Sequence, residues 1–435
     1  MGSKGQSLEQ EPGVSTRGSA SVSPAASRAK LPMAALGAWL VVAVYYFYQY
    51  ALRSAPSVMM PQLTEALGVN ALGVSAIVGM FYYGYSPFSL VAGAALDRFG
   101  ARRIIPIGAA LVGVGAMMFG TGNVAAANVG RFLQGAGGVF ALVGAVYLIT
   151  KNFPASMAAS FIGVTQMFGM AGGSAGQFFV GPIIKSGLPW GQFWIYSGIA
   201  GLVIAVCLFA FLPREAPAPA GGGLGSVLKS LKTVFLNPQS ILCGLISGLL
   251  FIPTTIFGMT WGVRYLQEAR GREYEAAVML AATVPLGWMV GCPLLGFLSD
   301  RIGRRKPVIL AGSAVMLGVM TWILFGDPAV FRGPLVGILL GIASGAAMIP
   351  YSVIKEVNPP RLGGSATGVI NFINFTFSAL LGPVFGSRLV VAPESNDITA
   401  LAHYQAGFRP LLLGIALALV LTCFLKETGS AARRT

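Results

Sequence analysis

Long apolar runs separated by short polar segments dominate the chain from residue 33 to residue 425. Several runs are ~20 residues long, the length that an α-helix needs to cross a hydrocarbon core of ~30 Å. Helices suit lipid because each one satisfies its own backbone hydrogen bonds. The pattern predicts an all-α polytopic membrane protein. The expected spans are 33–54, 72–95, 104–122, 124–149, 156–185, 191–212, 238–267, 275–298, 307–326, 333–354, 364–391 and 405–425.

Two breaks in composition divide this series of spans. Residues 1–32 are rich in Ser, Gly and Ala without apolar periodicity, which is typical of a disordered tail. Residues 213–237 begin rich in Pro and Gly, which indicates a flexible connector, and end in a basic stretch that can lie on the membrane surface. We therefore expect an N-terminal six-helix bundle at 33–212, a C-terminal six-helix bundle at 238–425 and a second tail at 426–435.

Charge and cysteine usage narrow the class further. Hydrophobic residues make up 55% of the chain and charged residues only 10%, so the surrounding solvent is lipid. Of 29 Lys and Arg residues, 20 fall on the side that holds both tails and the connector. By the positive-inside rule, we expect both termini in the cytoplasm. We also expect the protein in the plasma membrane of a bacterium, its inner membrane. The net charge of +15 thus reflects topology and not a nucleic-acid partner, and the four span-located cysteines suggest no metal site.

The two halves repeat one pattern. A charged hinge at 93–103 recurs at 296–306, a constant offset of 203. Span five carries an amide at Gln166 and span eleven carries one at Asn371, an offset of 205. Such duplication is how secondary transporters place two bundles around a midplane site. The shared hinge positions are Gly93, Asp97, Arg98, Gly100, Arg102 and Arg103 in the first half, and Gly296, Asp300, Arg301, Gly303, Arg305 and Lys306 in the second.

These features resemble the major facilitator superfamily. The resemblance rests on the six-plus-six spans, the long middle loop and the motif G-x-x-x-D-R-x-G-x-R-R after span two. Arg131-Phe-Leu-Gln-Gly in span four and the Gly-rich span five are similar to two further signatures. The resemblance implies a transporter in which the hinges latch the cytoplasmic side shut by packing on the opposite bundle. The implied gating residues are Gly93, Asp97, Arg98, Gly100, Arg102, Arg103, Asp300, Arg301 and Arg305.

Span one carries the main candidate for substrate binding. Tyr46, Gln49 and Arg53 are spaced by three and four residues, so they share one helical face. Arg53 either faces a ligand or snorkels to the outer headgroups, and position alone does not separate the two. The run Tyr50-Ala-Leu-Arg53 before Pro61 resembles the organophosphate and organic-anion branches, where such an Arg binds the substrate's anionic group.

One departure from that branch favours a carboxylate. Organophosphate antiporters carry a second Arg inside span seven, where this chain has Thr254, Thr255, Thr260 and Trp261. A single fixed cation fits a monoanion better than a phosphate dianion. We therefore predict an anionic small-molecule solute, with Gln166, Asn371, Asn374 and Tyr351 as further substrate-binding candidates and no cofactor.

Coupling and the competing functions stay open at this stage. In the family, the Arg at the position of Arg131 is linked to proton-coupled exchange, but it can equally brace the bundle. No acidic residue lies in the middle of a span and His403 is expected in a loop, so the coupled species is a proton, a counter-anion or none. The alternatives are a proton-coupled drug or metabolite exporter and a peptide or amino-acid transporter. An enzyme is excluded because the G-x-S-x-G match at 172–176 lies inside a span without a partner His, and we expect a monomer.

Overall fold

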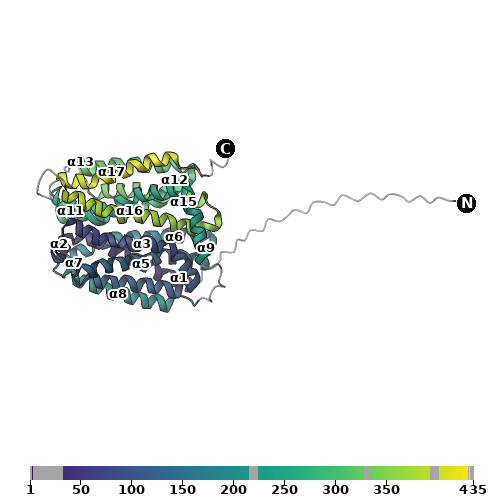
Figure 1. The fold of residues 1–435 in the computed structure, drawn as a ribbon, viewed down its shortest axis with the longest axis horizontal. Helices are drawn as coiled ribbons and strands as arrows, with labels where there is room; N and C mark the ends of the chain where they lie inside the picture. The colour runs from purple at the N-terminus through teal and green to yellow at the C-terminus, as the bar shows by residue number, and fades with distance from the viewer. Residues whose placement is uncertain are drawn as a thin grey trace.

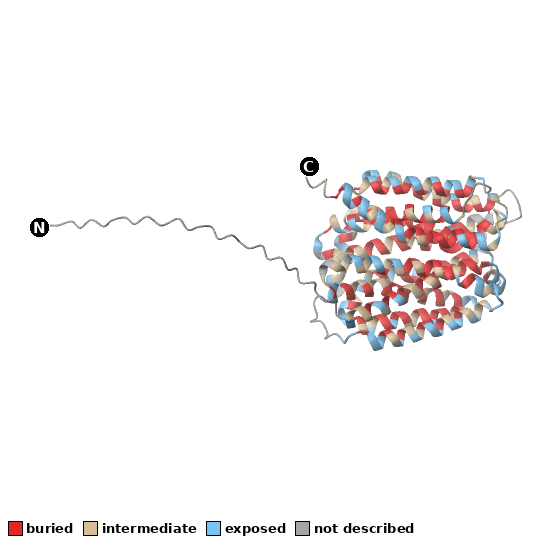
Figure 2. Cartoon of the chain, turned by 180° about the vertical axis from the view of Figure 1, so that it is seen from behind, coloured by how far each residue is buried: buried red, intermediate tan, exposed pale blue. Residues whose placement is uncertain are grey.

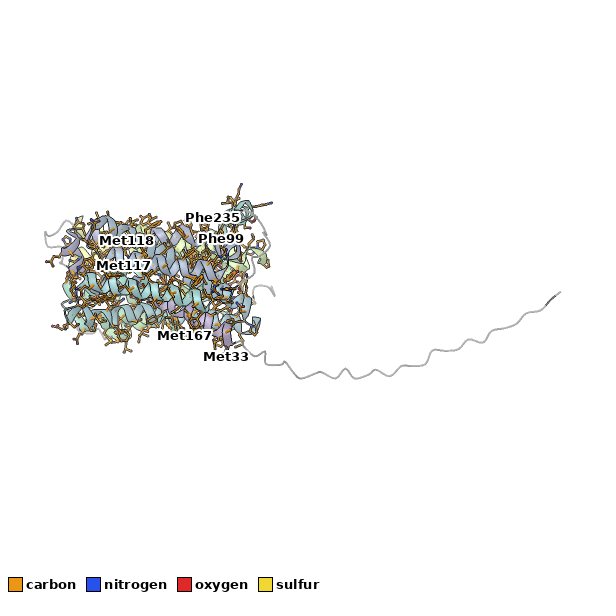
Figure 3. All side chains as sticks on the ribbon, turned by 90° about the horizontal axis from the view of Figure 1, so that it is seen from below. Met33, Phe99, Met117, Met118, Met167 and Phe235 are labelled. Carbon is orange, nitrogen blue, oxygen red and sulfur yellow. The ribbon has the colours of Figure 1, made fainter. Side chains whose placement is uncertain are left out.

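The computed structural model describes Gly2, residues 33–214, 224–327, 333–391 and 401–429, and Ala431. The predicted tail at 1–32, except Gly2, lies outside the described residues, as do residues 215–223 of the connector and residues 430 and 432–435 of the second tail. The described chain forms helices that run side by side (Figure 1). Met33, Phe99 and Phe235 lie at one end of the molecule (Figure 3), which we call the hinge end.

The N-terminal half contains the first six predicted spans. Span two ends at Phe99, so Asp97 and Arg98 belong to its last helical turn. Gly100 follows with a φ of 81°, a conformation that L-residues rarely adopt, as the predicted turn requires. The helices are α1 (Met33–Ser54), a 3₁₀ turn (Ala55–Val58), α2 (Met60–Leu67), α3 (Ala71–Phe99), α4 (Ala101–Phe119), α5 (Val124–Asn152), α6 (Ala155–Phe178), α7 (Val180–Lys185) and α8 (Trp190–Phe211).

The C-terminal half follows the amphipathic helix α9 (Leu224–Phe235). Its first span is irregular after Pro253, whose ring lacks an amide donor, and continues as a π-helix over Pro253–Trp261. His403, expected in a loop, lies inside the last helix and is 1% exposed, because that helix begins at Leu401. The remaining helices are α10 (Pro238–Ile252), α11 (Gly262–Glu268), α12 (Tyr274–Ile302), α13 (Lys306–Phe325), α14 (Gly333–Ser344), α15 (Ile349–Glu356), α16 (Gly363–Val391) and α17 (Leu401–Phe424).

The helices have the length and surface of membrane spans. Ten of the described helices are long and apolar enough to cross a bilayer, and the bent pair Met60–Leu67 and Leu72–Phe99 is an eleventh candidate. Helix α6, at the predicted span five, has 24 residues and so is ~36 Å long, sufficient for a crossing. Buried residues lie between the helices and exposed ones on the outer faces (Figure 2), where large apolar side chains such as Val206 and Leu413 are exposed. The prediction of an all-α polytopic membrane protein is confirmed.

The two halves meet along two equivalent helix pairs. Helix α3 packs on α16, and α12 packs on α6, so span two meets span eleven and span eight meets span five. Ser86 Oγ donates to the Phe372 carbonyl over 2.8 Å, and Ser89 Oγ donates to the Gly368 carbonyl over 3.3 Å. Because α3 and α12 are related by the repeat, as are α6 and α16, this pairing has the symmetry that a duplicated transporter needs.

Candidate functional site

A cavity of about 350 Å³ lies between the two halves. It is lined by α1, α3, α5 and α6 from the first half and by α10, α12, α15 and α16 from the second. Its lining extends to Asp300, Arg305 and Lys355, which lie near the hinge end. The cavity therefore opens toward the hinge end.

The opposite end of the interface is closed by bonds between the halves. Gln177 Nε2 donates to the Gly258 carbonyl over 2.7 Å, and Ser75 Oγ donates to the Gly382 carbonyl. A surface ion pair joins Lys185 to Glu275 over 3.4 Å. The site is thus accessible from the hinge end and sealed from the other.

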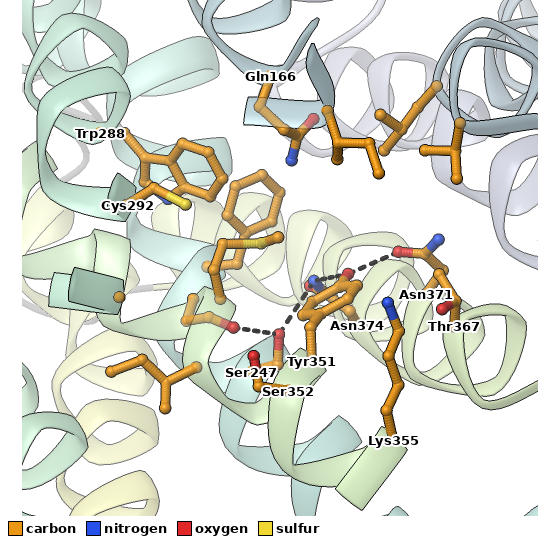
Figure 4. Close-up of a pocket in the computed structure, with 18 of the residues that line it drawn as sticks. Gln166, Ser247, Trp288, Cys292, Tyr351, Ser352, Lys355, Thr367, Asn371 and Asn374 are labelled. Atoms are coloured by element: carbon orange, nitrogen blue, oxygen red, sulfur yellow. Dashed lines mark hydrogen bonds between the residues drawn. The ribbon is translucent and has the colours of Figure 1, made fainter. Parts of the chain in front are cut away.

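Five of the seven predicted substrate-binding residues line this cavity, namely Tyr46, Gln166, Tyr351, Asn371 and Asn374. They form two hydrogen-bonded groups on facing walls. On the first wall, Tyr46 Oη donates to Gln166 Oε1 over 2.7 Å. On the second, Tyr351 Oη donates to Asn371 Oδ1 over 2.5 Å and accepts from Asn374 Nδ2 over 3.3 Å (Figure 4). The equivalent amides Gln166 and Asn371 therefore both reach the central space, as the repeat predicts.

Arg53 lies behind an aromatic layer at the inner end of the cavity. Its side chain is 2% exposed, so it does not snorkel to the surface. Its guanidinium carbon lies 4.9–5.5 Å from the ring centroids of five aromatic residues, three of which line the cavity. Those three are Tyr50, Phe251 and Phe375.

Several buried polar atoms around Arg53 have no hydrogen-bond partner among the described residues. Arg53 Nε donates to Tyr82 Oη over 3.3 Å, while Nη1 and Nη2 have no partner in the described part of the protein. Gln49, the remaining predicted residue, is 1% exposed and its amide oxygen and nitrogen also lack partners there. A buried guanidinium without an acceptor is costly, so this region is suited to receive an anion.

Arg131 lies away from the cavity and is fully enclosed. Its guanidinium donates to the Leu52 carbonyl over 3.4 Å, to the Val78 carbonyl over 3.4 Å and to Gln134 Oε1 over 2.8 Å. These contacts brace α5 against α1 and α3. The coupling role that the family resemblance implies stays a prediction.

The two hinges differ in their contacts. Arg102 donates to the Leu212 carbonyl over 3.1 Å within its own half, while Asp97, Arg98 and Arg103 are exposed. In the second hinge, Arg305 pairs with Asp300 and, over 2.8 Å, with Glu356. Arg301 is exposed as well, and the latch between bundles that the family resemblance implies stays a prediction.

Two carboxylates, Asp300 and Glu356, stabilise the charged form of Arg305. Burial alone would lower the pKa of this guanidinium, but the hydrogen bonds that it donates to Glu356 and Asp300 raise that pKa above its usual value. Arg305 therefore stays charged and bonded to both carboxylates, one of which, Asp300, lines the cavity. Among the described residues, no group of His, Cys, Asp or Glu could hold a metal ion.

Several cavity residues were missed by the sequence analysis. They include Ser247 and Cys292, which are small residues of otherwise apolar helices, and the three rings in front of Arg53. The most important omission is Lys355. Its signal was present, because Lys355 follows Tyr351 by four residues and so shares its helical face.

Comparison with known sequences agrees with this architecture. The family model described as Major Facilitator Superfamily matches residues 42–383. The hexuronate transporter of Bacillus subtilis is 26% identical over 366 residues, which cover 78% of this chain and 84% of that protein. The D-galactonate transporter of Escherichia coli O6:H1 is 24% identical over 74% of this chain and 82% of its own length. The Probable galactarate/D-glucarate transporter GudP of Escherichia coli K12 is 22% identical over 80% of this chain and 85% of that protein.

Solved structures share the fold at lower identity. A bacterial homolog of the human lysosomal transporter Spinster, in an inward-facing conformation, has a TM-score of 0.70 at 15% identity and covers 90% of this chain. A D-xylose–proton symporter has the same TM-score and identity, and 98% of its chain is covered. At such identity these likenesses show the fold alone. Because the family model covers most of the chain and the helices form its two bundles, the protein belongs to the Major Facilitator Superfamily and is a membrane transporter, not an enzyme.

Proposed function

We propose that the protein carries a small hydroxylated organic acid, in its carboxylate form, across the membrane by alternating access. The single observation that carries this proposal is the buried guanidinium of Arg53, with two nitrogens that lack a protein acceptor. The fork of an Arg matches the two oxygens of a carboxylate in a bidentate pair. The names of the relatives, which are transporters of hexuronate, galactonate and galactarate, support the same substrate class.

The second half of the cavity suits hydroxyl groups. Asn374 Oδ1 and Trp288 Nε1 are buried in its lining without a partner among the described residues, one an acceptor and the other a donor. A hydroxyl group both donates and accepts, so it can satisfy either atom. In this view, Arg53 selects the acidic group, and the amides of Asn371 and Asn374 with the Tyr351 hydroxyl bind the rest of the molecule.

The described conformation corresponds to an inward-facing state in this proposal. Basic residues gather at the hinge end, and by the positive-inside rule this end faces the cytoplasm. Transport then requires the hinge end to close and the opposite end to open. On substrate binding, the rings of Tyr50, Phe251 and Phe375 must also move aside, because they separate Arg53 from the cavity.

The test is uptake of labelled D-galactonate and a hexuronate by the full chain in proteoliposomes, with Arg53→Ala and Arg53→Lys variants. Arg264→Lys is a matched control, because Arg264 is a partly buried cation that already pairs with Glu268 over 2.7 Å and does not line the cavity. We expect Arg53→Ala to abolish uptake and Arg53→Lys to reduce it strongly, while Arg264→Lys retains it. Full uptake by a folded Arg53→Ala variant would refute the proposal.

A further inference from the structure

We propose that Lys355 forms a second anion-binding subsite at the mouth of the cavity and that the preferred substrate is a dianion. This inference rests on the proposed function and narrows its substrate class. A dianion here means a small molecule with two acidic groups, such as a hexaric acid, as opposed to a hexonic acid with one.

Lys355 lies in α15, one helical turn from Tyr351, and lines the same cavity as Thr367 and Asn371. Its ammonium group projects from α15 toward the central space, beside Asn371 and Thr367 (Figure 4). A lysine that served only as a topology signal would extend toward the lipid headgroups. Lys355 instead directs its charge into the path of the substrate.

The charged residues around the cavity differ in whether they are paired. Its charged lining residues are Asp300, Arg305 and Lys355. Arg305 pairs with Asp300 and Glu356, and Glu356 also accepts from Thr428 Oγ1 over 2.5 Å. In the described part of the protein, Lys355 itself makes no ion pair or hydrogen bond. Arg305 and Lys355 thus equal Asp300 and Glu356 in number, but both carboxylates contact Arg305, and the ammonium group of Lys355 contacts neither of them.

A second cation without a carboxylate partner among the described residues lies at the other end of the cavity. Arg53 lies at the inner end, behind the rings of Tyr50, Phe251 and Phe375. Neutral groups occupy the space between the two cations, including the hydrogen-bonded set of Tyr351, Asn371 and Asn374. A cation at each end with neutral polar groups between them matches a molecule with two terminal acidic groups and a hydroxylated middle. Two such charges also favour a dianion over a monoanion by simple Coulomb attraction.

The experiment compares galactarate with D-galactonate, which differ in one terminal carboxylate. Uptake kinetics are measured in proteoliposomes that contain the wild-type chain, Lys355→Gln, Lys355→Arg and Lys151→Gln. Lys151 is the matched control, because it is an exposed lysine at the end of α5 that does not line the cavity. Ligand-dependent thermal shifts of the purified full chain confirm that each variant is folded.

We expect the wild-type protein to prefer galactarate. Lys355→Gln should raise the KM for galactarate about tenfold, the effect of losing a charged hydrogen bond, and leave the KM for galactonate within about twofold. Lys355→Arg should keep the preference, and Lys151→Gln should change nothing. If the wild-type KM is equal for both solutes, or if Lys355→Gln weakens both equally, the second subsite is refuted while the organic-anion function stands. If neither solute nor a hexuronate is transported, the proposed function fails first.

Discussion

The Nε atom of Arg53 donates to the hydroxyl of Tyr82 over 3.3 Å, and this is the only hydrogen bond of that guanidinium to the described residues. The bond uses the side of the guanidinium that a bidentate carboxylate does not need. It leaves Nη1 and Nη2 available and restrains the rotation of the group. We therefore infer that Tyr82 positions Arg53 for the proposed substrate.

Replacement of Tyr82 should weaken substrate binding without unfolding the protein. In Tyr82→Phe the ring near Arg53 is kept and only the hydroxyl is lost, so we expect the affinity for an organic anion to fall about fivefold. The measurement is a thermal-shift titration with galactarate. Tyr83→Phe is the control, because Tyr83 is 40% exposed on the neighbouring position of α3. An unchanged affinity in Tyr82→Phe would show that Arg53 does not depend on this bond.

The bond from Gln177 to Gly258 should hold the opposite end shut. Gln177→Ala removes a buried hydrogen bond between the halves, which costs about 1 kcal/mol of the closed arrangement. We expect faster deuterium exchange at α7 and α11, which lie at that end. Lys185→Gln should have no such effect, because Lys185 and Glu275 are 64% and 87% exposed and such surface pairs contribute little. Equal exchange in Gln177→Ala and the wild type would count against the seal.

The sequence allowed the helices to be predicted, and also which helices of the two halves correspond. Apolar length and recurring motifs can both be read directly from the chain. Among the predicted residues that line the cavity, Gln166 and Asn371 were identified by their equivalent positions, and Tyr46 by its spacing from Gln49 and Arg53. The arrangement of the two halves cannot be read in this way. Whether Arg53 reaches the cavity depends on rings from α10 and α16, which are distant in sequence.

The same limit explains why Lys355 was absent from the predicted site residues. A lysine near the end of a span has the same pattern whether it faces lipid or a cavity, and only the packing of α15 against α16 decides which. The irregular backbone after Pro253 is also set by packing and not by periodicity. Whether the hinge end is open or closed is a property of the conformation, which hydrophobic periodicity does not encode.

The end of the chain should stabilise the second hinge. The carboxylate of Glu427 accepts from the backbone amides of Arg305, over 2.6 Å, and Lys306, over 3.1 Å, at the start of α13. A negative charge at a helix N-terminus is favourable, so we expect Glu427→Gln to cost about 1 kcal/mol and to lower the Tm of the purified protein. Glu65→Gln is the control, since Glu65 is exposed and lies in the last turn of α2, away from a helix N-terminus. The same Tm for both variants would contradict the capping role.

Two glycines of the first half should respond differently to an added side chain. A Cβ atom at Gly135 would lie 1.8 Å from the Phe81 carbonyl oxygen, whereas one at Gly93 would meet no atom within 4 Å. Gly135→Ala should therefore destabilise the protein by about 1–3 kcal/mol, because the crowded helices must move apart. In contrast, Gly93→Val should leave the Tm unchanged in the conformation described here.

Gly93→Val should nevertheless impair transport. Gly93 and its repeat partner Gly296 are both in open space while the hinge end is open, and a Cβ at either position meets nothing within 4 Å. If the hinge end closes by bringing the bundles together there, bulk at these positions obstructs closure. We expect Gly93→Val and Gly296→Val each to lower the uptake rate about tenfold, equivalent to a barrier higher by ~1.4 kcal/mol, with an unchanged Tm. Normal uptake in both variants would show that closure does not use these surfaces.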